Sequence, residues 1–586
     1  MKKRIALFLA IALVAAGITG CSDSSAKAEP ETEAAKTEAV QAATTAAATA
    51  AAAAESEEKT GLSELGELPI VKDGSKTLTI GLMQNSLTED YETNEYTKWL
   101  EEQTGIDLTF KYFSSNLDEA VTQLNLMIAG GEKLPDILYG MAGFEKSLMY
   151  ELGEDGYFVD LKDYFDKYGY YFWENYKKIN DIDKDLIFQY GTDPSNGAFY
   201  AFPRYMETNC DAVPAMSVIN TAWLEKVGAE IPSTVEELKA VLEKFASEDP
   251  NGNGQQDELP MMGFDGGYRT EIIQYVINAF VYCNKDNVFN VTDGKVWNPY
   301  TTDEYRQALI YLNDLYKEGL ISPMYYTISE DSELKTLMSP VDGTSIVGIA
   351  GSHPSLHFEL DNPTLYEYSP LYPLKGATSL GGYAALGSAE FAYVNFITTD
   401  CEDPELAFRF LDFMNSVDSF RRCRWGVFGE DWELSEPGAT TAAGIAAPVK
   451  VIDASIFGSQ NNKCWHNAGA PGVLTNSMWS NQFVDDGSWA SSRSKLAWGV
   501  YAKYLEAGQP EDVIYNLIYT SEEQELVSDV SVQIKDFIAE QQALFVSGEM
   551  NPSNDADWET YLANLQAQNM DEWLKVAQGA YDRMTK

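Results

Sequence analysis

The chain has 586 residues, of which 45% are hydrophobic, and its formal net charge is −49. A single hydrophobic core does not accommodate so long a chain, and two or more folded lobes are therefore expected. The negative charge makes nucleic acid and anionic membrane surfaces poor partners, and the presence of only three histidines argues against a His-rich catalytic metal centre.

Residues 1–20 are typical of an export signal. Basic residues at positions 2–4 precede an apolar run at 5–16, and small residues follow before Cys21. The tetrapeptide ending at Cys21 resembles a bacterial lipobox, in which this cysteine is lipidated and becomes the first mature residue. An ordinary secretory signal with an accidental cysteine is the alternative. We therefore expect a lipid-anchored protein at the outer face of the cell membrane, which is the periplasmic side in a Gram-negative cell.

Residues 21–64 are rich in Ala, Thr and Glu and contain few large apolar side chains. Such a segment cannot build a core and is interpreted as a tether between the anchor and the folded body. The cysteines beyond Cys21 are odd in number and widely spaced, without a C-x-x-C pair. No disulfide framework or zinc site is indicated by them.

Strands and helices are predicted to alternate from residue 76 onward. The elements are strands near 77–83, 106–113 and 134–140, with helices at 91–104 and 117–129 between them. This alternation predicts a parallel or mixed sheet with crossover helices. Ligands gather at the carboxyl ends of such strands, which nominates Gln84, Asn85 and Ser86 after the first strand and residues 139–141, beginning with Tyr139, after the third. Plain turn residues are the alternative.

The stretch 233–260 predicts a capped helix followed by a metal loop. Ser233 and Glu236 form a capping box, and one helical face carries Val235, Leu238, Leu242 and Phe245. This helix is expected to pack on a second sheet.

Oxygen-bearing side chains then recur around two glycines, a pattern that suits Ca²⁺. They are Asp249, Asn251, Asn253, Gln255, Asp257 and Glu258. The spacing matches the first nine positions of an EF-hand loop, with Gln255 offering its backbone carbonyl. Position twelve is Pro260, so Glu258 is the expected substitute for the usual glutamate. A polar turn without metal is the alternative, and a cage from one local loop is expected to stabilise structure rather than touch ligand.

Further elements follow along the second half of the chain. A helix with a capping box at Thr301 and Glu304 is predicted, and strands are predicted at 343–351 and from 366, both of which could cross between lobes. A further strand near 391–398 precedes a helix that begins with Asp403 as its cap. A Trp-rich stretch at 464–498 leads into a helical tail.

Several separated segments resemble one family, the extracellular solute-binding lipoproteins (family 1) of ABC importers, in the long subgroup that includes alginate oligosaccharide-binding proteins. The matching segments are the lipobox, LEEQTGIDLTF, GEKLPDIL, INTAWLEKVGAEIPSTVEELKAVL with DPNGNGQQDELP, YRQALIYLNDLYKEGLISP, RWGVFGEDWE and the tail from FIAEQQALF. They cover most of the chain after the tether.

The resemblance implies an α/β fold of the periplasmic-binding-protein-like type II class, with two lobes, mixed sheets and a hinge of two or three crossing strands. We expect the first lobe to comprise 65–212 and about 366–418, and the second 213–365 and about 419–586. The resemblance also implies calcium at 249–258 away from the cleft, a hinge strand ending at Gly351 that turns Ser352 and His353 toward the ligand, and Trp425 near the cleft.

Sugar sites combine stacking rings with planar polar groups. The residues predicted to stack are Tyr205, Tyr268, Trp465 and Trp479, because they stand beside glycines or polar residues rather than on apolar faces. Arg204 and Arg269, each next to one of these tyrosines, are candidates for binding hydroxyls or a uronate. Core packing for the rings and ordinary salt bridges for the arginines are the alternatives.

The leading hypothesis is a non-enzymatic, monomeric receptor that captures an extracellular oligosaccharide between its lobes and delivers it to a membrane permease. A peptide or another small polar solute as ligand is one alternative. An exported glycoside hydrolase is another, although no carboxylate pair is singled out by the sequence.

Overall fold

The structure is a computed structural model that describes residues 61–586, except for 142–145, 208, 285–286, 342, 360, 442–443, 445, 458, 467–471, 476–483 and 586. The architecture below concerns the compact unit Ser63–Lys586. No helix in the described part of the chain combines the length and apolar character needed to span a bilayer.

The first sheet has six strands in the order β14-β4-β11-β3-β1-β2. β1 pairs in parallel with β2 and β3, β14 pairs in parallel with β4, and β11 is antiparallel to both β3 and β4. The predicted mixed sheet is therefore confirmed. The strands are β1 (Lys76–Met83), β2 (Ile106–Phe113), β3 (Ile137–Tyr139), β4 (Ala201–Met206), β11 (Glu390–Ile397) and β14 (Gly472–Leu474).

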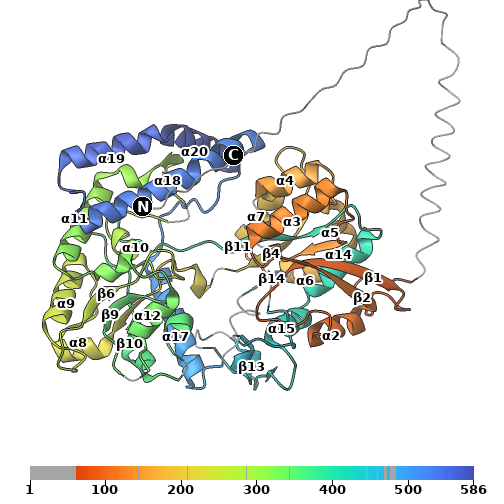
Figure 1. The fold of residues 1–586 in the computed structure, drawn as a ribbon, viewed down its shortest axis with the longest axis horizontal. Helices are drawn as coiled ribbons and strands as arrows, with labels where there is room; N and C mark the ends of the chain where they lie inside the picture. Colours follow the sequence, from red (N-terminus) through yellow and green to blue (C-terminus); the bar gives the residue numbers. More distant parts are fainter. Residues whose placement is uncertain are drawn as a thin grey trace, which may run out of the picture. The chain divides into compact units, whose positions relative to one another are not determined.

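The order of connections reverses around β1. Helix α2 (Glu95–Thr104) links β1 to its neighbour β2, and α3 (Leu117–Gly130) leads from β2 back past β1 to β3. Because right-handed crossovers in opposite directions place their helices on opposite faces, α2 and α3 lie on either side of this sheet (Figure 1). The carboxyl end of β1 is consequently a topological switch point, where open α/β sheets bind ligands.

Helices from two distant stretches complete this lobe. They are α4 (Lys146–Glu154), α5 (Lys162–Tyr168), α6 (Tyr171–Tyr176), α7 (Asp181–Gly191), α14 (Pro404–Met414) and α15 (Val417–Trp425). Phe165 lies at the centre of their core, with the rings of Phe172, Phe202 and Phe408 at 4.8–5.2 Å. These aromatic contacts pack the helices that precede β4 against helix α14, which follows β11.

The second sheet has four strands in the order β10-β5-β9-β6, with β6 and β9 parallel. The strands are β5 (Ser217–Asn220), β6 (Leu259–Met262), β9 (Val347–Gly351) and β10 (Tyr368–Pro370). Its helices include α8 (Thr221–Val227), α9 (Val235–Ser247), α10 (Ile272–Ile277), α11 (Asp303–Lys317), α12 (Asp331–Met338) and α13 (Pro354–His357).

Helix α9 buries the predicted face against this sheet. Its cap is Thr234 rather than Ser233, since the Thr234 side chain accepts from the N–H of Glu237 while Ser233 bonds the Glu237 carboxylate. Gly348 of β9 is required for the packing, because a Cβ there would lie 2.4 Å from the ring of Phe245.

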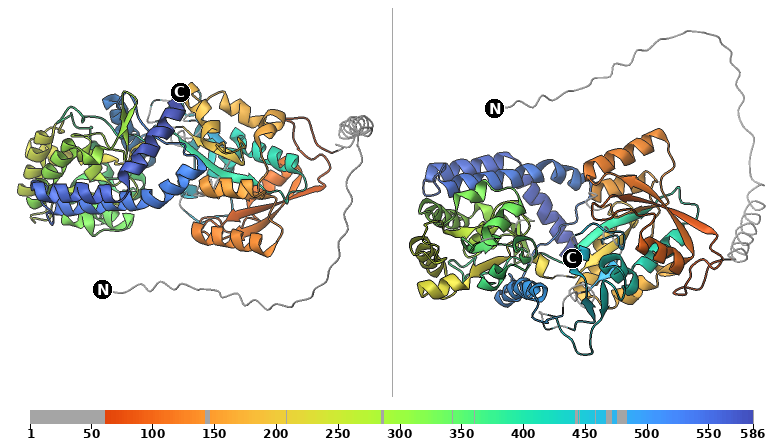
Figure 2. Two further views of the ribbon diagram at one scale, coloured as in Figure 1. Left: turned by 90° about the horizontal axis from the view of Figure 1, so that it is seen from above. Right: turned by 60° about the horizontal axis from the view of Figure 1, so that its bottom comes forward.

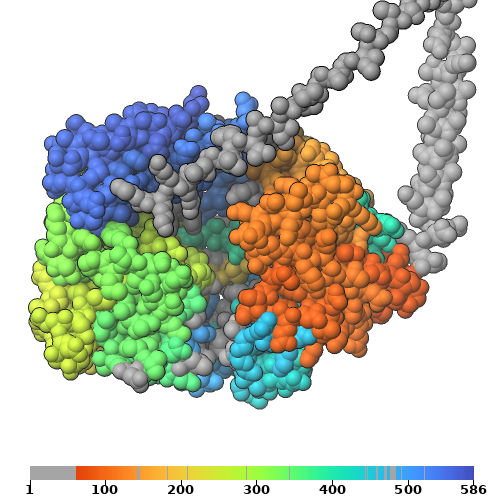
Figure 3. Space-filling view, in the orientation of Figure 1, coloured from red at the N-terminus to blue at the C-terminus, as the bar shows by residue number. Residues whose placement is uncertain are grey.

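Four C-terminal helices belong with the second sheet: α17 (Trp489–Ala507), α18 (Ser521–Ser547), α19 (Asp555–Ala567) and α20 (Met570–Thr585). Helix α18 packs along α11, as Figure 2 shows in blue and green. Two hairpins complete the fold, β7 (Asn290–Thr292) with β8 (Lys295–Trp297) and β12 (Trp432–Leu434) with β13 (Val449–Val451). The cyan surface in Figure 3 belongs to the second hairpin region and adjoins the red and orange first lobe.

The sheet assignments correct three expectations. β9 and β10 both lie inside the second sheet, so neither crosses between lobes, and the first-lobe segment resumes with β11 rather than near residue 366. β14 belongs to the first sheet although it falls within 419–586. β9, β10 and β14 have three to five residues, too few for an alternating pattern to reveal which sheet they join. The described chain passes between the sheets after β4, after β10 and after β14.

Candidate ligand-binding site

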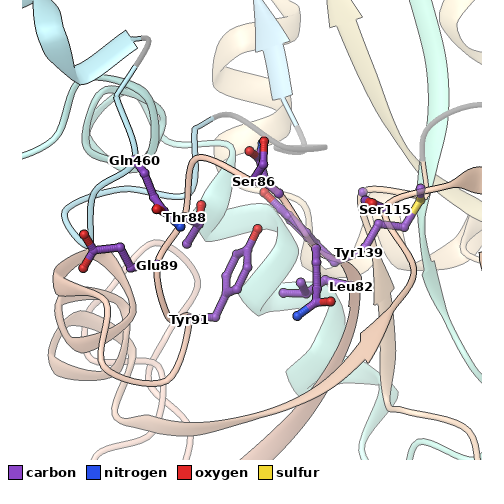
Figure 4. A pocket seen from close by; sticks show the side chains of 12 residues that line it. Leu82, Ser86, Thr88, Glu89, Tyr91, Ser115, Tyr139 and Gln460 are labelled. Atoms are coloured by element: carbon purple, nitrogen blue, oxygen red, sulfur yellow. The ribbon is translucent and has the colours of Figure 1, made fainter.

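A cavity of about 640 Å³ lies at the carboxyl ends of β1, β2 and β3, at the switch point of the first sheet (Figure 4). The loop after β1 provides most of its wall. The lining residues are Leu82, Met83, Gln84, Asn85, Ser86, Thr88, Glu89, Tyr91, Ser115, Tyr139, Gly140 and Gln460. The structure therefore brings together Gln84, Asn85, Ser86 and Tyr139, with Gly140, from the residues nominated at the strand ends, whereas Met141 does not line the cavity.

Polar side chains shape the loop after β1. The Oδ1 atom of Asn85 accepts a hydrogen bond from the N–H of Leu87 at 2.9 Å, and the Asn85 carbonyl accepts from the N–H of Thr88 at 3.1 Å. This is an Asx turn, in which a side-chain oxygen takes the place of a backbone acceptor. The side-chain amide of Gln84 makes no hydrogen bond with any described residue. Asn85 therefore has a structural role at the cavity, whereas the amide of Gln84 remains available.

Two buried tyrosines lie in the wall of this cavity. Tyr139 is 2% exposed and Tyr91 is 4% exposed, and in the described part of the chain neither hydroxyl has a hydrogen-bond partner. Thr88 shares this condition at its Oγ1 atom. Burial raises the pKa of both tyrosines above the usual value, although the nearby Thr88 side chain and Asn85 backbone oppose this for Tyr91, so the phenols stay protonated and can donate. A buried hydroxyl without a partner costs about 1–3 kcal/mol, and a ligand rich in hydroxyls would remove that penalty.

The buried ring of Trp465 packs against both tyrosine rings. It has no exposed surface, and its ring meets Tyr91 at 5.6 Å and Tyr139 at 5.5 Å between centroids, both edge-on. Its Nε1 donates to the Oγ1 of Thr97 at 2.9 Å. The prediction that Trp465 stacks on ligand is therefore wrong for this structure. The indole fills the interior because four aromatic rings surround it, and it acts on the cavity through the tyrosines.

The loop before Trp465 is hydrogen-bonded to the loop after β1. The N–H of Asn461 donates to the carbonyl of Leu87 at 2.9 Å, and the N–H of Glu89 donates to the carbonyl of Asn461 at 3.1 Å. Asn462 bonds the Asn94 side chain that caps α2. These contacts place Gln460 on the cavity wall although it lies more than three hundred residues from Asn85.

The second sheet has its own group of polar and aromatic side chains at the carboxyl ends of β6 and β9. Tyr268 is 42% exposed, and its ring packs edge-on against His353 with centroids 5.2 Å apart. The guanidinium carbon of Arg269 lies 5.1 Å from the centroid of the Tyr268 ring. Ser352 is fully buried and hydrogen-bonds His357, so the expectation that Ser352 faces ligand is wrong in this structure.

Other nominated residues are occupied in packing. The hydroxyl of Tyr205 donates to Asp183 at 2.6 Å, and Arg204 forms a 3.0 Å ion pair with Glu390. Both belong to β4, in which Tyr205 is buried and Arg204 is partly buried. Trp425 has no exposed surface and packs on Trp432 at 5.9 Å in the core of the β12–β13 region. Trp479 lies outside the described residues.

The loop 249–258 folds around its own oxygens. The Asp249 carboxylate accepts from the N–H groups of Gly252 and Gly254, and the Asp257 carboxylate accepts from the side-chain amides of Asn251 and Asn253. Gly252 and Gly254 have positive φ angles of 74° and 78°, as the turn requires. In the described chain no three acidic, His or Cys side chains converge as a formed metal cluster.

One feature of this loop remains open to a cation. The Oε1 of Glu258 is buried and has no hydrogen-bond partner among described residues. Burial raises the pKa of Glu258, and the neighbouring charges of Asp257 and Asp249 raise it further. A divalent ion would relieve both effects, because it supplies the positive charge that these oxygens lack.

Sequence reasoning missed most of the cavity wall. Ser115 follows the second strand, so the strand-end rule could have nominated it. Tyr91 stands at the start of the predicted helix 91–104 but lies in the loop before α2, and Thr88 and Glu89 precede it in the same loop. No sequence pattern marks Gln460 as a lining residue, because only the tertiary fold brings it to the cavity.

Comparison with known proteins gives the following similarities. No family model matches the chain. It is 24% identical over 497 residues to the fructooligosaccharide ABC transporter substrate-binding protein FusA of Streptococcus pneumoniae, covering 83% of this chain and 86% of FusA. It is 30% identical over 234 residues to the lipoprotein LipO of Bacillus subtilis, covering 38% of this chain and 41% of LipO.

Solved structures show the same fold. An EF-hand mutant of FusA in complex with fructo-nystose has a TM-score of 0.67 at 23% identity, covering 87% of this chain and 99% of that one. The alginate-binding protein AlgQ2 without calcium ion has a TM-score of 0.57 at 20% identity, covering 90% and 100%. The fold is thus the two-lobe α/β fold of solute-binding proteins, as the sequence resemblance implied.

Proposed function

We propose that this chain, whose homologues and structural neighbours are substrate-binding proteins of ABC transporters, captures an extracellular oligosaccharide and delivers it to a membrane permease. The observation that carries the proposal is the cavity at the switch point of the first sheet, whose wall contains buried polar atoms of Tyr91, Tyr139 and Thr88 that no described residue hydrogen-bonds. The relatives' names support a saccharide: FusA is named for fructooligosaccharides and AlgQ2 for alginate.

The cavity chemistry matches sugar hydroxyls. Phenol and threonine hydroxyls both donate and accept, and the amides of Gln84 and Gln460 add further donors and acceptors. The carboxylate of Glu89 accepts hydrogen bonds from vicinal hydroxyls. Hydrogen bonds to these groups can therefore replace the hydrogen bonds to water that each sugar hydroxyl loses on binding. A polar ligand needs this replacement in order to bind in a buried site.

The second sheet provides the other half of the site in this proposal. Tyr268 presents an exposed ring on which the C–H face of a sugar packs, and His353 supports that ring. A ligand that contacts both lobes only when they close favours the closed form by its differential affinity. No covalent step is required, so the protein acts as a receptor rather than as an enzyme.

Export, lipidation at Cys21 and a calcium ion complete the proposal. The lipobox and the similarity to the lipoprotein LipO support a membrane anchor, although residues 1–60 lie outside the described chain. The loop 249–258 fits Ca²⁺ by its oxygen donors and by the buried, unpartnered Oε1 of Glu258. Of the similar structures, one is an EF-hand mutant of FusA and another is AlgQ2 without calcium ion, which agrees with a calcium loop in such proteins. The ion would hold the loop's shape and take no part in ligand binding.

The test is calorimetric titration of the purified mature chain with kestose, nystose, lactose-based and uronate oligosaccharides, alongside tri- to pentapeptides. We expect at least one oligosaccharide to bind with micromolar or tighter affinity, and no reducing sugar to be released on prolonged incubation. Binding of peptides but of no saccharide would refute the ligand class, and steady release of reducing sugar would show an enzyme.

A further inference from the structure

The loop after β6 carries an arginine that no carboxylate in the described part of the chain neutralises. Arg269 forms no ion pair with any described residue, and its Nε is buried without a hydrogen-bond partner. Its guanidinium lies over the ring of Tyr268. In a chain whose acidic residues outnumber its basic ones by 90 to 41, such an unpaired cation stands out, because a carboxylate partner is statistically easy to find.

The backbone at Arg269 is held in a conformation that arginine disfavours. Its φ angle is 63°, in the left-handed region where a Cβ is strained. Gly266 and Gly267 stand nearby in the same loop, and a glycine at position 269 would make the turn without strain. Strained non-glycine residues persist where the surrounding structure holds them, and they gather at ligand sites.

Backbone hydrogen bonds fix one side of this loop. The N–H of Met216, just before β5, donates to the carbonyl of Arg269 at 3.1 Å. The carbonyl of Met216 in turn accepts from the N–H of Ser352 at 2.8 Å, just after β9. The backbone of Arg269 is therefore connected through Met216 to Ser352, which follows the inner strand β9 of the second sheet.

A chain of side-chain contacts links Ser352 back to the same loop. The hydroxyl of Ser352 lies 3.3 Å from Nδ1 of His357, and Nε2 of His357 lies 2.9 Å from Oδ1 of Asp331. The same oxygen of Asp331 accepts from the N–H of Tyr268 at 3.2 Å. These residue types also make hydrolytic triads, but Ser352 has no exposed surface, so its hydroxyl cannot meet a substrate. Their role is to position Tyr268 and Arg269.

We propose that Arg269 recognises a carboxylate on the captured saccharide, while Tyr268 packs against the ring that carries it. This inference rests on the proposed oligosaccharide function and specifies its ligand as an acidic sugar. The guanidinium fork matches a carboxylate with two parallel hydrogen bonds. Because the whole chain repels anions at long range, a fixed local cation is needed to select an acidic ligand.

The experiment compares acidic and neutral ligands of the same skeleton by calorimetry. One pair is trigalacturonate and its methyl ester, and the other is sialyllactose and its methyl ester. We expect the acidic member of at least one pair to bind tenfold or more tightly than its neutral partner, and this advantage to shrink as salt is raised. In R269Q the advantage disappears, while the affinity for neutral sugars changes less than about twofold. R306Q, which alters a partly buried arginine paired with Asp555, is the matched control and keeps the preference for the acidic ligand.

A second variant separates recognition from folding. R269G removes the side chain and also relieves the positive φ angle, so its melting temperature stays the same or rises while the preference for acid is lost. Equal or tighter binding of the neutral members by the natural chain overturns the inference and leaves the proposed function standing. A preference for acid that survives in R269G also overturns it. If no saccharide binds at all, the proposed function fails and this inference falls with it.

Discussion

Tyr91 and Tyr139 line one cavity from two different segments, and neither hydroxyl has a hydrogen-bond partner in the described chain. Folded proteins seldom leave buried hydroxyls unsatisfied, so water or a bound ligand is expected to complete the hydrogen bonds of this pair. Both rings are held from behind by Trp465, so their positions are set before any ligand arrives. This preorganisation lowers the entropic penalty of binding.

The first prediction concerns these hydroxyls. Y91F and Y139F each lower the affinity for the bound oligosaccharide by about 3–10-fold, the loss of one hydrogen bond. Their melting temperatures stay the same or rise slightly, because a buried hydroxyl without a partner has been removed. Calorimetry and thermal unfolding measure the two effects.

The control is Y96F. The Tyr96 hydroxyl is bonded to Ser419 at 2.7 Å, so its loss lowers stability by roughly 1 kcal/mol and leaves affinity unchanged. If Y91F and Y139F behave like Y96F, their hydroxyls are structural and the cavity assignment is wrong.

The second prediction concerns the tryptophan beneath the cavity. W465F removes the hydrogen bond to Thr97 and leaves a small void, lowering the free energy of unfolding by roughly 1–3 kcal/mol. The affinity falls as well, because Tyr91 and Tyr139 lose their support. W489F makes the same change in the core of the second lobe, and we expect it to reduce stability without altering affinity. Equal affinities for the two variants would contradict the supporting role of Trp465.

The third prediction concerns the loop 249–258. Calcium raises the melting temperature of the natural chain, and chelation with EGTA lowers it again. The double variant D249A/D257A melts at a lower temperature that no longer depends on calcium, while ligand affinity at 25 °C is unchanged. D107A, at an exposed strand position, retains the calcium response. A large loss of affinity in the double variant without a loss of stability would place this loop at the ligand site.

The fourth prediction concerns the pH dependence of stability at His357. Burial lowers the pKa of this imidazole below its usual 6.5, despite the opposing hydrogen bond to Asp331. The unfolded chain therefore binds this proton more tightly than the folded chain, so the histidine's contribution is fully present above pH 6.5 and is lost as pH falls below it.

H357Q, which cannot titrate, is the comparison. The difference in melting temperature between the natural chain and H357Q should narrow between pH 7 and pH 5. A difference that is constant or widens on acidification would contradict the assignment of a neutral, buried imidazole.

The sequence predicts the elements that have clear periodicity. β2 and the start of α3 fall at the predicted residues, and the alternation of strands and helices indicates the mixed sheet. The caps of α9 and α11 each lie one residue later than predicted, at Thr234 and Thr302, because adjacent Ser/Thr residues compete for the role.

The site is predicted only in part, because local sequence does not report tertiary burial. The strand-end rule leads to Gln84 and Tyr139, since it depends on topology alone. It cannot reveal that Trp465 lies inside an aromatic cluster, that Tyr205 bonds Asp183, or that a distant loop brings Gln460 to Thr88. Those facts depend on contacts between segments far apart in the chain.

A crystal structure of the mature chain with its tightest-binding oligosaccharide tests the central claim most directly. We predict sugar hydroxyls within hydrogen-bond distance of the Tyr91 and Tyr139 hydroxyl oxygens, in the cavity beside Gln84 and Gln460. An oligosaccharide bound elsewhere on the protein, with those two hydroxyls still unpartnered, would contradict it.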